Sequence, residues 1–167
     1  ESHAANFPTV DHYRGDIREA PVETWPVTDI FWASPECPQW SNARGKKRDF
    51  DASLQGDLFD GFGPTEEEER SRALMEEVPM YLRGVQQRGG LVKAGVVENV
   101  VDVRAWDQWD RWIGEIRKLG YETRVIALNS MHADPRTVHK APQSRDRLYV
   151  AYWHKSLGRT PDWDKWL

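Results

Sequence analysis

Residues 29–41 read Asp-Ile-Phe-Trp-Ala-Ser-Pro-Glu-Cys-Pro-Gln-Trp-Ser, and the predicted fold is built around this stretch. Four apolar residues, 30–33, indicate a short strand that ends at Pro35. Cys37, the only cysteine of the chain, follows between Pro35 and Pro38, whose rings fix φ and limit where the thiol can lie. Open α/β folds place their chemistry at such carboxyl ends of strands. A lone cysteine is more often a buried structural residue, so its role depends on the rest of the sequence.

The composition is that of a single globular domain. The chain has 167 residues, of which 39% are hydrophobic and 30% charged, enough for one core and too few for two domains. A single cysteine excludes an internal disulfide and fits a reducing compartment. The histidines show no metal-ligand spacing, so no metal site is predicted, and no apolar run is long enough to span a membrane. The net charge of −4 means that any contact with nucleic acid has to be local.

Strands and helices alternate along the chain. Thr65 can cap a helix, with Glu68 completing a capping box, and Pro79 predicts a kink or break within that helix. The expected elements are a strand ending at Asp16, a strand at 30–33, a helix from 65 to about 87, a strand at 91–97, a helix at 106–119, and strands at 121–128 and 148–153. This alternation predicts a mostly parallel α/β sheet covered by helices.

Residues 42–64 have no apolar periodicity. Loops of this length in compact domains are usually lids or binding loops, or else disordered. Four basic residues lie close together near its start: Arg44, Lys46, Lys47 and Arg48. They form either a solvated surface cluster or a loop that contacts phosphate groups and closes over a site.

Two polar motifs adjoin predicted strands. Glu98-Asn99-Val100 follows one predicted strand. Removing a carboxylate from water at such a position costs free energy, which a polar partner or a functional role would explain. An exposed loop glutamate is the simpler alternative. Gln143-Ser-Arg145-Asp-Arg147 leads directly into the last predicted strand.

Four motifs in this order resemble those of DNA (cytosine-5)-methyltransferases. The segment around Cys37 resembles the family's Pro-Cys nucleophile motif, and Glu98-Asn99-Val100 matches its Glu-Asn-Val motif. Residues 143–147 match Gln-x-Arg-x-Arg, and Asp16-Ile17 resembles the family's contact to the adenine of S-adenosylmethionine. The resemblance covers roughly residues 6–153. It implies a Rossmann-like α/β sheet of an S-adenosylmethionine-dependent methyltransferase, mostly parallel, with helices on both faces and incomplete at both ends.

The sequence also departs from this family. The family usually has Pro-Pro-Cys followed by Gln, whereas here Glu36 precedes the cysteine and Gln39 lies two residues after it. The Gly-rich cofactor strand would lie before Glu1, and the target-recognition region after Leu167. We therefore expect residues 1–167 to be a partial catalytic domain that works with missing N- and C-terminal parts of the same enzyme, with 42–64 as an enlarged catalytic loop.

The resemblance implies roles for the motif residues. Cys37 would add to carbon 6 of a cytosine flipped out of double-stranded DNA, so that carbon 5 can accept a methyl group from S-adenosylmethionine. Glu98 would hydrogen-bond or protonate ring nitrogen 3, and Arg147, with Arg145, would bind the base's carbonyl oxygen. The resemblance further assigns cofactor contacts to Asp16, Ile17 and Pro35, and DNA contacts to Gln39, Ser41, Arg44, Lys46, Lys47 and Arg48.

Two alternatives from other classes remain open. One is a relative that methylates RNA or a free pyrimidine nucleotide by the same cysteine addition. The other is a non-catalytic DNA-binding fragment, which the missing cofactor strand favours. For a methyltransferase of this family we expect a bacterial or phage-encoded protein of the cytoplasm, without a membrane partner.

Overall fold

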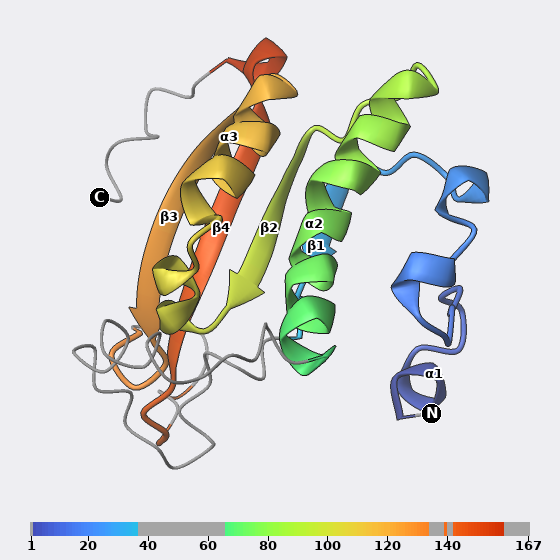
Figure 1. Cartoon of the computed structure of the whole chain (residues 1–167). Coiled ribbons are helices and arrows are strands. Elements are labelled where there is room, and N and C mark those ends of the chain that lie inside the picture. The colour runs from blue at the N-terminus through green and yellow to red at the C-terminus, as the bar shows by residue number, and fades with distance from the viewer. Residues whose placement is uncertain (1, 37–65, 134–138, 140–141, 159–167) are drawn as a thin grey trace.

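The computed structural model describes residues 2–36, 66–133, 139 and 142–158, with the side chains of the helix that begins at 66 described from residue 73 onward. Within these ranges a four-stranded sheet has the order β1-β2-β4-β3 (Figure 1). Its strands are Ile30–Ala33 (β1), Ala94–Asn99 (β2), Tyr121–Asn129 (β3) and Asp146–His154 (β4), and the α-helices are Ser2–Asn6 (α1), Glu66–Gln87 (α2) and Trp109–Lys118 (α3). Among the described helices, none is long and apolar enough to cross a membrane.

The sheet is mixed. β1 pairs with β2 in parallel, whereas β4 pairs antiparallel with both β2 and β3. Three of the four described strands, β1, β2 and β3, therefore run in the same direction, in agreement with the predicted mostly parallel sheet, and β4 runs against them. β4 runs against its neighbours because the described residues between β3 and β4 (130–133, 139 and 142–145) contain no helix. A parallel neighbour needs a long crossover connection, usually a helix, but an antiparallel one does not.

The two long helices, α2 and α3, lie side by side on one face of the sheet (Figure 1). They share a core with the side chains that alternate toward them from the strands, namely Val97, Tyr121, Leu148, Val150 and Tyr152. Trp112 of α3, fully buried, donates from Nε1 to the carbonyl oxygen of Met75 in α2 at 2.7 Å. Helices on both faces were predicted, but in the described part of the chain α2 and α3 cover the same face.

Several further features differ from the predicted ones, among them the start of β4 at Asp146, which places Arg147 inside the strand rather than before it. Residues 11–16 form no strand; Asp16 instead caps a short 3₁₀ helix, Ile17–Glu19. β2 begins and ends later than predicted, so that Glu98 lies inside the strand rather than after it. α2 continues through Pro79 without a break.

A tyrosine hydroxyl ties β4 to the edge strand β1. Tyr152 reaches across Gly95 of β2 and donates to the carbonyl oxygen of Phe31 at 3.0 Å. Burial raises the pKa of Tyr152, so the hydroxyl keeps its proton and remains a donor. A Cβ atom at Gly95 would overlap both the Phe31 carbonyl oxygen and the Tyr152 ring. Glycine is therefore required at this position by the close approach of two neighbours.

We predict that Gly95→Ala lowers the free energy of unfolding by about 1–3 kcal/mol, because the added methyl group forces the sheet backbone or Tyr152 to move. The matched control is Gly114→Ala in α3, where a Cβ would meet no described atom within 4 Å. This control should raise the stability by about 0.5–1 kcal/mol, because alanine loses less entropy than glycine in a helix. Urea denaturation of both variants measures the difference, and equal midpoints would contradict the packing described here.

Candidate active site

An ion pair joins the two polar motifs that the sequence singled out. Arg147 of β4 donates from Nε to Oε1 of Glu98 in β2 at 2.8 Å. The two residues are diagonal neighbours, because Glu98 lies opposite Tyr149 in the antiparallel register. The side chain of Glu98 is 23% exposed and that of Arg147 is 22% exposed. Partial shielding from water strengthens the attraction relative to a surface pair. The structure thus brings together two residues that are 49 positions apart in the sequence.

The pair lies in a cleft of about 470 Å³. This cleft forms on the sheet face opposite α2 and α3, at the edge where β1, β2 and β3 end and β4 begins. Besides the ion pair it is lined by Trp32, Ser34, Leu128, Ser130, Ala133, His139, Arg145 and Tyr149. Arg145, the other predicted arginine, is exposed there, and its carbonyl oxygen accepts from the backbone N–H of Ser130 at 3.1 Å.

Sequence reasoning missed two aromatic residues of this cleft. Trp32 of β1 and Tyr149 of β4 meet edge to face, with ring centroids 6.4 Å apart and an interplanar angle of 67°. Trp32 also donates from Nε1 to the hydroxyl oxygen of Ser34 at 3.1 Å. Strand alternation could have found Tyr149, because it lies two residues after Arg147 and therefore on the same face. No sequence signal pointed to Trp32, since its neighbours across the sheet come from β2 and β4.

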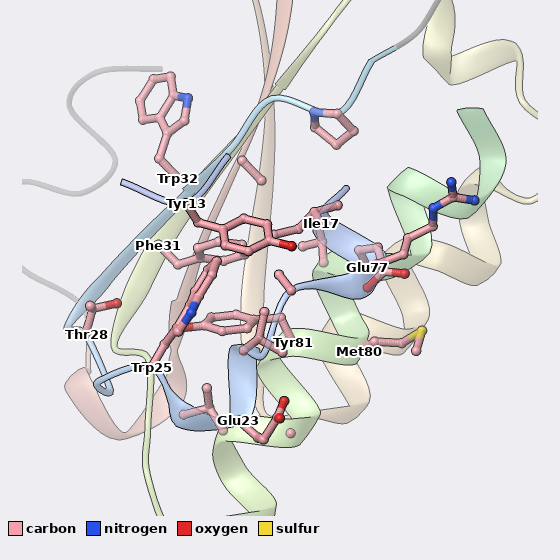
Figure 2. A pocket seen from close by; sticks show the side chains of 18 of the residues that line it. Tyr13, Ile17, Glu23, Trp25, Thr28, Phe31, Trp32, Glu77, Met80 and Tyr81 are labelled. Atoms are coloured by element: carbon pink, nitrogen blue, oxygen red, sulfur yellow. The ribbon is translucent and has the colours of Figure 1, made fainter. Parts of the chain in front are cut away.

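A second, larger cavity of about 1240 Å³ lies between residues 11–28, β1 and α2. Its walls carry the aromatic side chains of Tyr13, Trp25, Phe31 and Tyr81 (Figure 2). Phe31 and Tyr81 pack with ring centroids 4.5 Å apart. The two cavities have Trp32 and Ser34 in common, so they adjoin at the end of β1.

The residues predicted to contact the cofactor divide into two groups. Ile17 and Pro35 line the second cavity. Asp16 is not among its lining residues. Its carboxylate instead accepts from the backbone N–H of Arg18 at 3.0 Å and from the Arg18 side chain. The sequence interpretation placed Asp16 at a strand end, where its carboxylate would face a ligand, but here it caps a 3₁₀ helix.

The remaining predicted site residues lie outside the described residues. They are the predicted nucleophile Cys37 and the predicted DNA contacts Gln39, Ser41, Arg44, Lys46, Lys47 and Arg48. The described chain reaches Glu36, which is exposed, immediately before the cysteine.

Comparisons with known proteins identify the fold. No protein-family model matches the sequence, and no curated protein matches it. Among solved structures, the methyltransferase EhMeth of Entamoeba histolytica is similar, with a TM-score of 0.52 and 14% sequence identity over 95% of this chain. A mutant of DNMT2 from Spodoptera frugiperda is similar with a TM-score of 0.56 and 16% identity over 93% of this chain.

The chain spans only part of both structures, 42% of EhMeth and 39% of the DNMT2 mutant. At such low identity the likeness concerns the fold, which two methyltransferases share over nearly all of this chain. Four short sequence motifs had led to the prediction of an α/β methyltransferase fold. The chain therefore has an α/β fold similar to that of these two structures.

Proposed function

We propose that this chain is the catalytic part of an enzyme that transfers a methyl group from S-adenosylmethionine to carbon 5 of a cytosine flipped out of double-stranded DNA. The observation that carries the proposal is the Glu98–Arg147 ion pair in a cleft at the end of β1. Pro35 and Glu36 lead from this strand directly to Cys37. A carboxylate, a guanidinium and a thiol near one another are the groups that cysteine addition to a pyrimidine requires.

Cys37 would act as the nucleophile. Its thiolate forms a bond to carbon 6 of the cytosine, and the ring electrons move toward carbon 5, which then becomes able to attack a methyl group. When bound, S-adenosylmethionine would supply that methyl group, and the electron pair of the broken bond would stay on its sulfur, which leaves as a neutral thioether. Carbon 5 afterwards loses its proton to a base, the electrons return to the ring, and the bond between sulfur and carbon 6 breaks, which restores the thiolate. A base within a duplex is out of reach of the thiol, so the cytosine has to be flipped out.

Glu98 and the arginines would bind the base. Arg147 occupies one oxygen of the Glu98 carboxyl group, and the second oxygen, once it carries a proton, can donate to ring nitrogen 3. A hydrogen bond or proton at nitrogen 3 withdraws electrons from the ring as the thiolate adds. Arg147, with Arg145 at the mouth of the same cleft, would bind the carbonyl oxygen of the base.

The second cavity fits the cofactor in part. Its aromatic and apolar walls, which include Ile17 and Pro35, suit an adenine ring, and it adjoins the cleft in which the base would lie. Asp16 fits less well, because Arg18 already engages its carboxylate. We propose that further cofactor contacts come from parts of the enzyme outside this chain.

DNA would be held locally, because the chain as a whole is acidic. The basic residues Arg44, Lys46, Lys47 and Arg48 would contact phosphates from the catalytic loop, and Gln39 and Ser41 would contact the DNA beside the nucleophile. The residues that read the DNA sequence would belong to a separate target-recognition region.

We predict that Cys37→Ala in the full-length enzyme abolishes methyl transfer to duplex DNA, while its affinity for the same DNA stays within about threefold, because the thiol takes part in the chemistry rather than in phosphate contacts. Transfer of a radioactive methyl group and a gel-shift titration measure the two quantities. Retained turnover in this variant would exclude Cys37 as the nucleophile.

The same assay with the unmodified enzyme separates the alternatives. Duplex DNA, transfer RNA and free dCMP are offered side by side, and we expect transfer to the duplex alone. Transfer to RNA or to dCMP would reassign the substrate. Binding to DNA without transfer to any of the three would favour a non-catalytic DNA-binding role.

We predict that Glu98→Gln lowers kcat by about 100- to 10,000-fold, because the amide cannot donate a proton to the base in the same way. The matched control is Glu115→Gln in α3. Glu115 has the same side-chain exposure, 23%, and also pairs with arginine, at 2.8 Å from Arg83. It lies in α3, on the opposite face of the sheet from the cleft, and does not line the cleft, so its loss should leave kcat unchanged. Equal losses in both variants would point to stability rather than catalysis.

We predict that this chain alone binds S-adenosylmethionine weakly or not at all. Only two predicted cofactor residues, Ile17 and Pro35, line the adjoining cavity. Isothermal titration of the cofactor into the chain measures the affinity. Tight binding would show that residues 1–167 already contain a complete cofactor site.

A further inference from the structure

Asn99 is a polar residue in the hydrophobic core. Among the side chains that the structure describes, it is the one polar or charged residue that is buried, with 5% exposed. Burying an amide costs free energy unless its hydrogen bonds are satisfied. The proposed catalysis uses the neighbouring Glu98 but gives Asn99 no role, so its burial has to be explained by its own contacts.

The amide of Asn99 contacts three parts of the chain. Its Oδ1 accepts from the backbone N–H of Val100 at 2.8 Å, just before the 3₁₀ helix Val101–Ala105. Its Nδ2 lies 3.5 Å from the sulfur of Met75 in α2 and donates to the carbonyl oxygen of Pro35 at 3.4 Å. The last contact joins segments that are 64 residues apart in the sequence.

The contact to Pro35 lies where the chain leaves the sheet. Pairing of β1 with β2 ends at Ala33, opposite Val97, so Pro35 is beyond the last paired residue. Proline has no N–H, and its carbonyl is therefore the one backbone group that can form a hydrogen bond. Cys37 follows two residues later, within at most about 7 Å of extended chain. A group that holds Pro35 therefore restricts where Cys37 can lie.

We propose that Asn99 is a positioning residue, whose amide holds the Pro35 carbonyl and so sets where the segment carrying Cys37 leaves the sheet relative to Glu98. The inference rests on the proposed function, because Asn99 acts only through Cys37. Adjacent residues of a strand point to opposite faces. Glu98 faces the cleft and Asn99 faces α2, so one rigid dipeptide positions both the carboxylate and the nucleophile's segment. A misplacement of about 1 Å can lower a rate about 100-fold.

The test is Asn99→Asp in the full-length enzyme. Aspartate has nearly the same shape and keeps an oxygen for the Val100 N–H, but as a carboxylate it cannot donate to Pro35. We expect kcat for methyl transfer to duplex DNA to fall about 10- to 100-fold. The KM for DNA should change by less than about threefold, because Asn99 does not face the cleft. Amide hydrogen exchange of residues 34–41, measured without substrate, should become about tenfold faster or more.

The matched control is Met75→Leu, which removes the sulfur contact of the same amide but keeps the donor to Pro35. It should leave kcat and the exchange of residues 34–41 unchanged. Unchanged exchange in Asn99→Asp, or an equal effect of Met75→Leu, would overturn the inference. If Asn99→Asp does not fold, Asn99→Ser is measured in the same way, since its hydroxyl can accept from Val100 but is too short to reach Pro35.

The two proposals fail separately. Absence of methyl transfer by the unmodified enzyme overturns the proposed function, whatever the exchange data show. Normal transfer together with unaltered exchange in the Asn99 variants leaves the proposed function standing and overturns only the role of Asn99.

Discussion

The alternation of side chains along β2 is the constraint on which the candidate site depends. Because consecutive residues of a strand face opposite sides, Glu98 points to the open face of the sheet and Asn99 points into the core. A register shift of one residue would exchange them and place a carboxylate among apolar side chains. The packing of Val97 under the helices therefore also fixes the orientation of Glu98. The packing that stabilises the core thus also determines which face of the sheet carries the Glu98 carboxyl group.

The antiparallel direction of β4 is the second requirement. Glu98 lies near the end of β2 and Arg147 near the beginning of β4, and such positions meet only if the two strands run in opposite directions. If β4 ran parallel to β2, its beginning would lie at the opposite edge of the sheet from the end of β2. The Glu98–Arg147 pair therefore depends on the direction of β4, which runs against the other three described strands.

Local patterns predicted much of the fold, and long-range relations account for what they missed. Apolar runs located β1 and β3, and apolar periodicity located α2 and α3. Burial of one face of a segment produces a regular spacing of apolar residues within that segment, so local sequence is enough to find it. Strand direction produces no such local pattern, because it depends on which strands pair with one another. Asp16 was misplaced for a related reason: Asx capping of a 3₁₀ turn and a polar strand end look alike in sequence. Two partners of Asn99, Met75 and Pro35, lie far from it in the sequence, which no local pattern could reveal.

The end of β1 is the point at which the two cavities adjoin, and this has a chemical consequence. Trp32 and Ser34 contribute to both cavities, and Pro35 lines the larger one while its carbonyl is held by Asn99. Transfer of a methyl group requires donor and acceptor to be in contact, while each still needs its own binding surface. A single edge strand that separates two cavities and ends between them meets both needs. Under the proposed function, the nucleophile would belong in the segment that continues that strand, where the sequence has Cys37.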